Sequence, residues 1–375
     1  MKIMVVLGTR PEAIKLAPVI REAQRHADRI ELTVCSTGQH REMLDQALKV
    51  FGITPDIDLQ IMQPNQTLAG LTARLLEQLD GVFRQHTPDF VVVQGDTTTA
   101  FAAGLAAFYQ QITVAHVEAG LRTGDLQSPF PEELNRVMIG RMARWHFAPT
   151  LKAGQNLRHE GITDTSILIT GNTVVDAIDL LQQQWQQDGG ISKHLDLFPG
   201  RRQVLITAHR RENFGSGLQQ ICAAVKTLCE KYPDIGFIFP VHLNPQVRSI
   251  VHAMLSSLPN LKLLEPVNFQ ESLYLQSWST LIITDSGGIQ EEAPSFGVPV
   301  VVMREHTERG EGIEAGFATL AGTDPDAIVA AAVQYLDNPE LTSRLNGRSN
   351  PYGDGRAASR IMQALLGEPI EAWHA

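Results

Sequence analysis

Cysteine is scarce in this sequence: its 375 residues include only Cys35, Cys222 and Cys229, and no CxxC pair. Cys222 and Cys229 lie two turns apart in a predicted helix, so we expect no disulfide between them. Three such thiols fit small apolar core residues in a reducing compartment. No grouping of histidines and cysteines has metal-ligand spacing, and we therefore expect no metal site.

Long apolar runs and basic clusters are missing as well. No apolar stretch approaches the roughly 20 residues that span a bilayer, and the short run at residues 1–7 lacks the cleavage pattern of a signal peptide. We therefore expect a cytoplasmic protein without a membrane partner. The net charge is −10 with no Lys/Arg-rich run, which argues against nucleic acid as a partner.

What is present is an ordinary globular composition, with 43% hydrophobic and 19% charged residues. Short Val- and Ile-rich runs alternate with segments of helical period along nearly the whole chain. Runs that are apolar on both faces are typical of buried parallel strands, and the alternation predicts βαβ units. The predicted strands are residues 3–7, 32–36, 90–94, 113–117, 167–169, 204–207, 236–239, 261–264, 281–284 and 298–303, and the clearest helices are 13–23, 68–83, 218–228 and 357–366.

The alternation pauses at residues 182–202, a Gln-rich stretch followed by Gly-Gly and Pro-Gly pairs. The length of the chain suits two domains. We therefore predict an α/β protein with two Rossmann-like doubly wound domains that face a cleft. The first domain comprises residues 1–172, with a final helix at 356–375 packing back on it, and the second, nucleotide-binding domain comprises residues 173–355.

The segment 8–15 follows the first predicted strand, and ligands of open parallel sheets bind beyond such strand ends. Gly8 permits a tight turn and Pro11 suits the first turn of a helix. Arg10 and Lys15 then lie near a helix N-terminus, where anions are favoured. Taken alone, the segment is equally well an ordinary turn with surface charges.

Carboxylates from three segments gather at the same predicted sheet edge. Asp96 and Glu118 end neighbouring strands, and Glu132 and Glu133 follow a Pro-rich turn. Asp96 alone could be a helix N-cap, and one of the glutamate pair could merely favour a helix start. Several carboxylates close together are costly unless they have partners or take part in catalysis, so the group as a whole favours a functional site.

In the second half, polar loops again follow predicted strands. Residues 207–213 contain a histidine and two arginines, and residues 240–245 contain another histidine. A later loop with Arg304, Glu308 and Arg309 is placed to close over a ligand.

The most informative stretch is residues 284–292. Ser286 can cap a helix, and Gly287 and Gly288 let backbone amides approach a phosphate closely. Glu292 follows about two turns into the helix, on a face that could meet ribose hydroxyls. The stretch therefore predicts a nucleotide-diphosphate site.

Together these segments resemble the non-hydrolysing bacterial UDP-N-acetylglucosamine 2-epimerases, in order and over nearly the whole chain. The resemblance rests on GTRPEAIK (8–15), GDTTT (95–99), HVEAGLRTGD (116–125), SPFPEE (128–133), ITGNTVVDA (169–177), AHRREN (208–213), PVHLNP (240–245), TDSGGIQEEAPSFGVPV (284–300) and NPYGDG (350–355). It implies a glycosyltransferase-B-like fold, a homodimer, and neither metal nor nicotinamide cofactor. One departure is Gly310, where relatives often have proline, which makes that loop more flexible.

The resemblance also implies the reaction: reversible epimerisation at C2 of UDP-N-acetylglucosamine to UDP-N-acetylmannosamine, through UDP elimination to 2-acetamidoglucal and re-addition. The product would supply a bacterial surface polysaccharide. The implied catalytic residues are Asp96, Glu118, Glu132 and His209. The implied substrate-binding residues are Arg10, Lys15, Ser286, Gly287, Gly288, Glu292 and Arg309. A second UDP-N-acetylglucosamine, acting as an activator, would bind Gln39, His40, Gln66, Arg210 and His242.

Three other functions stay open on the sequence alone. A hydrolysing epimerase would release free N-acetylmannosamine and UDP. A glycosyltransferase would need an acceptor site, which a sequence does not show. A non-catalytic nucleotide-sugar sensor would have no need of the carboxylate set, so the presence of that set argues against it.

Overall fold

The protein is described from a computed structural model, which describes residues 1–38, 41–63, 66–187, 197–208, 210 and 215–374, without the side chains of residues 41–43 and 186–187. The chain forms two compact units, unit 1 (Met1–Leu181 with Tyr352–Ala375) and unit 2 (Gln182–Pro351). The division falls inside helix α7 (Thr173–Gln187), whose first residue coincides with the predicted domain boundary. In the described residues, no helix is long and apolar enough to cross a membrane.

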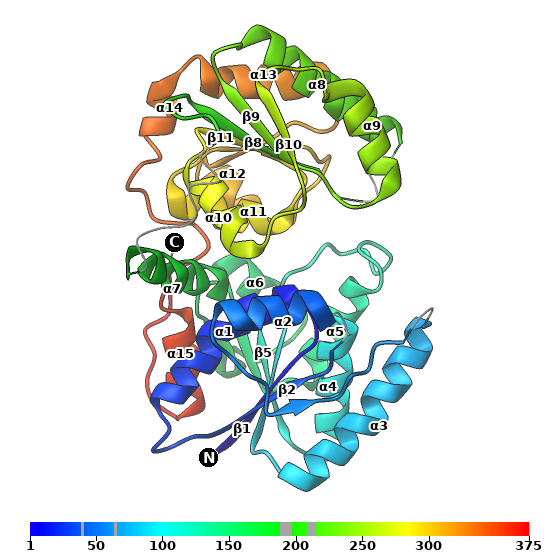
Figure 1. The fold of residues 1–375 in the computed structure, drawn as a ribbon. Coiled ribbons are helices and arrows are strands. Elements are labelled where there is room, and N and C mark those ends of the chain that lie inside the picture. Colours follow the sequence, from blue (N-terminus) through cyan, green and yellow to red (C-terminus); the bar gives the residue numbers. More distant parts are fainter. Residues whose placement is uncertain (39–40, 64–65, 188–196, 209, 211–214, 375) are drawn as a thin grey trace. The chain divides into compact units, whose positions relative to one another are not determined.

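Unit 1 is built on a parallel sheet of seven strands in the order β3-β2-β1-β4-β5-β6-β7 (Figure 1). The strands are β1 (Lys2–Leu7), β2 (Glu31–Ser36), β3 (Ile57–Asp58), β4 (Phe90–Gln94), β5 (Thr113–Val117), β6 (Trp145–Ala148) and β7 (Ile167–Ile169). Besides α7, the helices are α1 (Arg10–Arg25), α2 (Arg41–Val50), α3 (Leu68–His86), α4 (Thr98–Tyr109), α5 (Glu132–Met142), α6 (Leu151–His159) and α15 (Ala357–Leu365).

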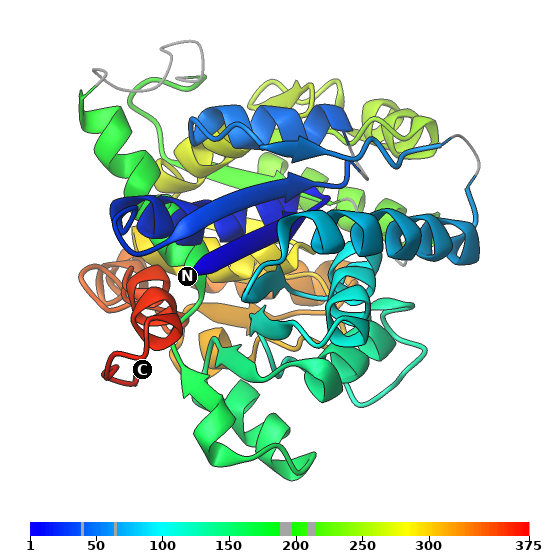
Figure 2. The ribbon, with the colours of Figure 1, turned by 90° about the horizontal axis from the view of Figure 1, so that it is seen from below.

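Helices cover both faces of this sheet. Met4 and Val6 of β1 belong to a core cluster with α3, α4 and α5, and the side chains that alternate with them point to the other face. On that face α1 packs on β1 and β2, and the carboxy-terminal helix α15 lies beside α1 (Figures 1 and 2). The carboxylate of Asp176 accepts the backbone N–H groups of Ala357 and Ala358, at 3.2 and 2.8 Å, and so caps the start of α15.

Unit 2 repeats the plan with six parallel strands in the order β10-β9-β8-β11-β12-β13. The strands are β8 (Gln203–Thr207), β9 (Gly236–Pro240), β10 (Leu261–Leu264), β11 (Leu281–Thr284), β12 (Val300–Val302) and β13 (Ala318–Leu320). The helices are α8 (Ser216–Lys231), α9 (Pro245–Leu255), α10 (Phe269–Ser277), α11 (Gly287–Glu292), α12 (Gly310–Glu314), α13 (Pro325–Leu336) and α14 (Pro339–Ser343).

The core of unit 2 is likewise divided by the sheet. Val204 and Ile206 of β8 pack with α8, α9 and α13, whereas Leu205 between them packs with residues of α10 and α11. Both sheets are therefore parallel, buried on both faces and doubly wound, which confirms the predicted α/β fold class of two Rossmann-like domains.

Candidate functional site

The strand order fixes where a ligand site is expected in each unit. It reverses between β1 and β4 in unit 1, and between β8 and β11 in unit 2. Ligands of open α/β sheets bind at this reversal, beyond the carboxyl ends of the strands. The segments that follow these four strands hold Arg10, Asp96, Arg210 and Ser286, so the sequence-predicted residues lie at both reversal points.

The turn after β1 is organised by Glu12, which the sequence analysis did not single out. Its carboxylate accepts the backbone N–H groups of Gly8 and Thr9, at 3.0 and 2.8 Å, in a capping box that starts α1. The hydroxyl of Thr97, which follows β4, donates to its other oxygen at 2.6 Å. Burial raises the pKa of Glu12 to about 7. Glu12 thus ties together the turns that carry Arg10 and Asp96, and the T-x-x-E spacing was the signal for it.

Lys15 and Glu118 form an ion pair in which both side chains are nearly buried. The amide of Asn172 lies 3.4 Å from the same Glu118 oxygen. Glu118 has a φ of +63°, in the left-handed region that residues with a side chain seldom adopt. Such strain concentrates at functional sites, because the surrounding structure must impose it. Lys15 and Glu118, predicted from separate motifs, therefore belong to one cluster.

Asp96 is held through both its side chain and its main chain. Its carboxylate lies 2.8 Å from Nε of Arg136, and its carbonyl oxygen accepts the Asn135 amide at 2.8 Å. The preceding carbonyl, of Gly95, lies 2.8 Å from Nε2 of His116 on β5. The N-cap of α4 is Thr97 rather than Asp96, so the alternative role weighed for Asp96 does not apply.

Glu132 and Glu133 at the start of α5 occupy different surroundings. Glu133 is buried, accepts the backbone N–H groups of Thr123 and Gly124, at 3.0 and 3.1 Å, and pairs with Arg136. Glu132 is partly exposed. The structure therefore gives Glu133 a role in holding its own loop and helix, and leaves Glu132 accessible to solvent.

In unit 2, Ser286 is the N-cap residue of α11, although its side chain makes no capping hydrogen bond to the helix. A methyl carbon at Gly287 would lie 2.7 Å from Cζ of Arg309, so the guanidinium group rests against this turn. Glu292 at the end of the helix is nearly buried and accepts the amide of Gln276 at 2.6 Å. Ser286, Gly287, Arg309 and Glu292 are thus parts of one neighbourhood.

Two arginines, Arg304 and Arg309, pair with the carboxylate of Glu308 near this turn. Burial by itself would raise the pKa of Glu308, but Arg309, a backbone hydrogen bond, Arg304 and the charge of Arg210 together outweigh it and lower this pKa to about 2. Arg309 also pairs with Glu291 at 2.8 Å. A cluster of arginines beside a glycine-containing helix start has the chemistry to bind a diphosphate.

The turn after β8 is joined to the one after β11. The backbone N–H of Arg210 donates to the buried Asp285 carboxylate at 3.0 Å, and its Nε donates to the Asp285 carbonyl at the same distance. His209, predicted to be catalytic, lies outside the described residues.

The other residues predicted to bind an activator are distributed over both units. In unit 1, Oε1 of Gln66 accepts a hydrogen bond from Nη2 of Arg74 at 2.5 Å. In unit 2, Nδ1 of the exposed His242 accepts a hydrogen bond from the Asn244 backbone N–H at 3.2 Å. Gln39 and His40 lie outside the described residues.

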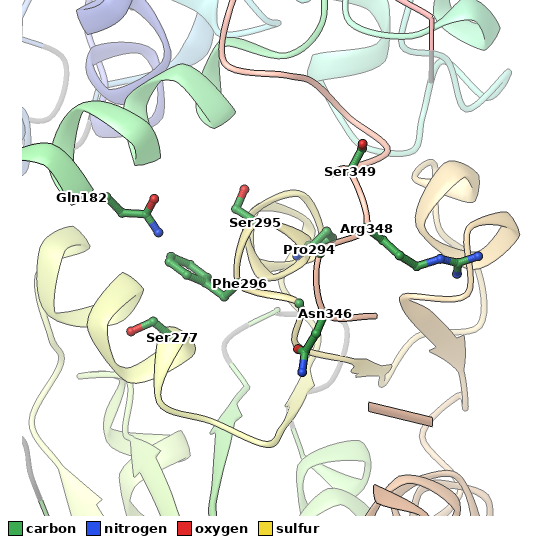
Figure 3. Close-up of a pocket in the computed structure, with 10 residues that line it drawn as sticks. Gln182, Ser277, Pro294, Ser295, Phe296, Asn346, Arg348 and Ser349 are labelled. Atoms are coloured by element: carbon green, nitrogen blue, oxygen red, sulfur yellow. The ribbon is translucent and has the colours of Figure 1, made fainter. Parts of the chain in front are cut away.

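A separate pocket of about 390 Å³ lies in unit 2 beside η4 (Ala293–Phe296), the short helix that follows α11. In Figure 3 the Phe296 ring points toward Gln182 and Ser277, whereas Arg348 points away from them. The lining of this pocket contains none of the predicted site residues. Across the described part of the chain, no three His, Cys, Asp or Glu side chains are grouped so as to hold a metal ion.

Comparison with known proteins shows which proteins this chain resembles. Residues 21–366 match the family model described as UDP-N-acetylglucosamine 2-epimerase. An Escherichia coli UDP-N-acetylglucosamine 2-epimerase is 48% identical over 375 residues, which is 99% of this chain and 100% of the relative. The crystal structure of UDP-GlcNAc 2-epimerase from Neisseria meningitidis bound to UDP-GlcNAc matches with a TM-score of 0.92 and 47% identity, over 98% of this chain and 100% of that one. The Methanocaldococcus jannaschii UDP-GlcNAc 2-epimerase in complex with UDP-GlcNAc and UDP matches with a TM-score of 0.80 and 34% identity, with the same two coverages.

Proposed function

This chain belongs to the UDP-N-acetylglucosamine 2-epimerase family and has the epimerase activity of that family, and we propose that it inverts C2 by eliminating UDP and adding it back. The C2 hydrogen is barely acidic, so removing it while UDP stays attached to C1 would be prohibitive. In the elimination, a carboxylate takes the C2 proton, the C1–O bond breaks with its electron pair leaving on UDP, and a C1=C2 double bond forms. Protonation of the other face of C2 and attack of UDP on C1 complete the inversion.

We assign the proton transfers to Asp96 and Glu118, with Glu132 as the third partner. The two carboxylates follow adjacent strands, and each has its own cation, Arg136 for Asp96 and Lys15 for Glu118. Carboxylates also stabilise positive charge at C1 in other reactions of sugars.

UDP would be held by the unit 2 cluster. We propose that the turn of Ser286, Gly287 and Gly288 binds the diphosphate together with Arg309, and that Glu292 binds the ribose. The support is the position of Arg309 against Gly287. Each well-placed donor to a developing anion contributes roughly 3–4 kcal/mol. The predicted participation of Arg10, Lys15 and His209 in the same cradle remains a prediction.

The observation that carries this proposal is the location of both clusters where the strand order of a sheet reverses. Its test is turnover of UDP-N-acetylglucosamine by Asp96→Asn and Glu118→Gln, with Asp28→Asn as an exposed control from unit 1. We expect each site variant to lose turnover by about a hundredfold or more, to bind UDP like the parent, and the control to be unchanged. Full turnover in either site variant would contradict the assignment.

The products separate the alternatives. Free N-acetylmannosamine and UDP in equal amounts would indicate a hydrolysing epimerase. Turnover that depends on an added acceptor would indicate a glycosyltransferase. Binding without any turnover would indicate a sensor.

A second UDP-N-acetylglucosamine is proposed to activate the enzyme through Gln39, His40, Gln66, Arg210 and His242. The proposal is supported by the contact of Arg210 with Asp285, one residue before Ser286, because a ligand on Arg210 would then act directly on the proposed diphosphate turn. A sigmoidal initial-rate curve is expected. A hyperbolic curve, with no activation of the reverse reaction by added UDP-N-acetylglucosamine, would count against it.

A homodimer is also proposed. Its support is a set of large apolar side chains that are exposed on α4 and α5, namely Phe108, Tyr109, Leu134 and Met138, because exposed apolar side chains gathered on neighbouring helices mark interaction surfaces. The cytoplasmic location and the supply of a surface polysaccharide remain predictions from the sequence.

A further inference from the structure

We propose that Arg136 is a positioning residue of this reaction: its guanidinium group fixes the Asp96 carboxylate in place relative to Glu132. The inference rests on the proposed role of Asp96 in proton transfer, and it adds a residue that no motif of the sequence singled out.

The guanidinium group of Arg136 lies between two carboxylates and hydrogen-bonds to each of them, an arrangement called the fork below. Nε and Nη2 of Arg136 each lie 2.8 Å from Oδ2 of Asp96, and Nη1 lies 2.8 Å from Oε2 of Glu133. The Arg136 side chain is 8% exposed, whereas that of Asp96 is 25% exposed. The guanidinium is therefore enclosed by protein, while the carboxylate it holds remains open to a substrate.

Glu133 anchors this fork to the fold. Its side chain is 1% exposed, and it accepts the N–H groups of Thr123 and Gly124. Burial opposes the charged form of Arg136, but Asp96 and Glu133 together outweigh burial and raise the pKa of Arg136. The arginine thus stays charged with one side attached to an immobile partner, and its other side can orient Asp96.

The same helix holds the main chain of Asp96. Asn135, next to Arg136 on α5, donates its amide to the Asp96 carbonyl at 2.8 Å. Because α5 also begins with Glu132, one rigid element carries one proposed catalytic carboxylate and holds the other by side chain and backbone. The distance between Asp96 and Glu132 is therefore set by α5.

Proton transfer requires that the carboxylate be held at a fixed position and orientation relative to the reacting carbon. A lysine would supply the charge but not the planar fork that fixes orientation. Charge and orientation can therefore be tested separately, by replacing Arg136 with glutamine or with lysine.

Other titratable groups near Asp96 come from two more elements. His116 on β5 is buried and neutral, because burial lowers its pKa to about 3. Glu12 on α1, bonded to the neighbouring Thr97, has a pKa raised by burial to about 7.

The experiment measures kcat and KM for Arg136→Lys and Arg136→Gln. The control is Arg141→Gln, an exposed arginine in the last turn of the same helix. Circular dichroism and thermal unfolding establish that each variant is folded.

For Arg136→Gln we expect kcat to fall about 100-fold and KM to change little. Arg136→Lys should lose kcat only about tenfold, again with little change in KM, because lysine restores the charge but not the planar fork. Arg141→Gln should match the parent in both quantities.

A parental kcat in folded Arg136→Gln would overturn the inference. If that variant does not fold, Arg136→Lys decides, because an unchanged kcat there would remove the need for the fork. Asp96→Asn separates this inference from the proposed function. An inactive Asp96→Asn beside normal Arg136 variants refutes only the role of Arg136, whereas an active Asp96→Asn refutes the role of Asp96 itself.

Discussion

Asp96 and Glu118 follow adjacent strands, yet each is paired with a cation from a different helix, Arg136 from α5 and Lys15 from α1. Like charges in one site normally raise the cost of ionising both groups. A separate cation beside each carboxylate offsets part of that cost and holds each group in place. The pairing depends on tertiary contacts between segments far apart in the chain, which is why the sequence predicted the carboxylates but not Arg136.

Glu12 gives a residue-scale prediction about pH and stability. Its pKa of about 7 in the folded protein exceeds the ordinary value of 4.5, so stability present below pH 4.5 is lost as the pH rises through 7. Glu12→Gln cannot ionise, so we expect its free energy of unfolding relative to the parent to rise by about 3 kcal/mol between pH 4.5 and 7.5.

Urea unfolding at both pH values measures the effect of Glu12→Gln. Glu77→Gln, an exposed position on α3, is the matched control and should follow the parent. An equal pH dependence in the parent and in Glu12→Gln would show that Glu12 does not titrate as described.

At the scale of elements, the short apolar runs predicted most strands well. Residues 90–94, 113–117 and 261–264 coincide with β4, β5 and β10. Three short strands were missed: β3 has two residues, β13 has three and β6 has four. The predicted strand at 298–303 was too long, because Pro299 lies inside it and β12 begins only at Val300.

The turn before α11 gives an element-scale prediction. In Gly287→Ala the new methyl carbon would meet the Arg309 guanidinium at 2.7 Å, so the arginine must leave the turn. We expect UDP to bind about tenfold more weakly, with little change in thermal stability.

The control for Gly287→Ala is Gly81→Ala in α3, where no atom lies within 4 Å of the added carbon. It should stabilise the helix by up to about 1 kcal/mol and leave UDP affinity unchanged. Isothermal titration with UDP measures both variants, and parental affinity in Gly287→Ala would show that Arg309 does not act at this turn.

At the scale of the whole molecule, the two units share one plan, with three strands on one side of a reversal point and the remaining strands on the other. The alternation of strands and helices predicted this class, because parallel strands buried on both faces need helical crossovers. It did not predict the order of the strands, which depends on packing between distant segments. This order nevertheless makes β1 the neighbour of β4 and β8 the neighbour of β11, so the residues that follow each pair of strands lie close together.

The proposed mechanism requires that C2 loses its hydrogen as UDP is eliminated, and that a proton and UDP are then added back. Proton NMR of UDP-N-acetylglucosamine incubated with the protein in D₂O tests it most directly. We expect UDP-N-acetylmannosamine that carries deuterium at C2, with no accumulation of free N-acetylmannosamine. Product that retains its original hydrogen at C2 would contradict it, because the proposed elimination cannot occur without breaking that bond.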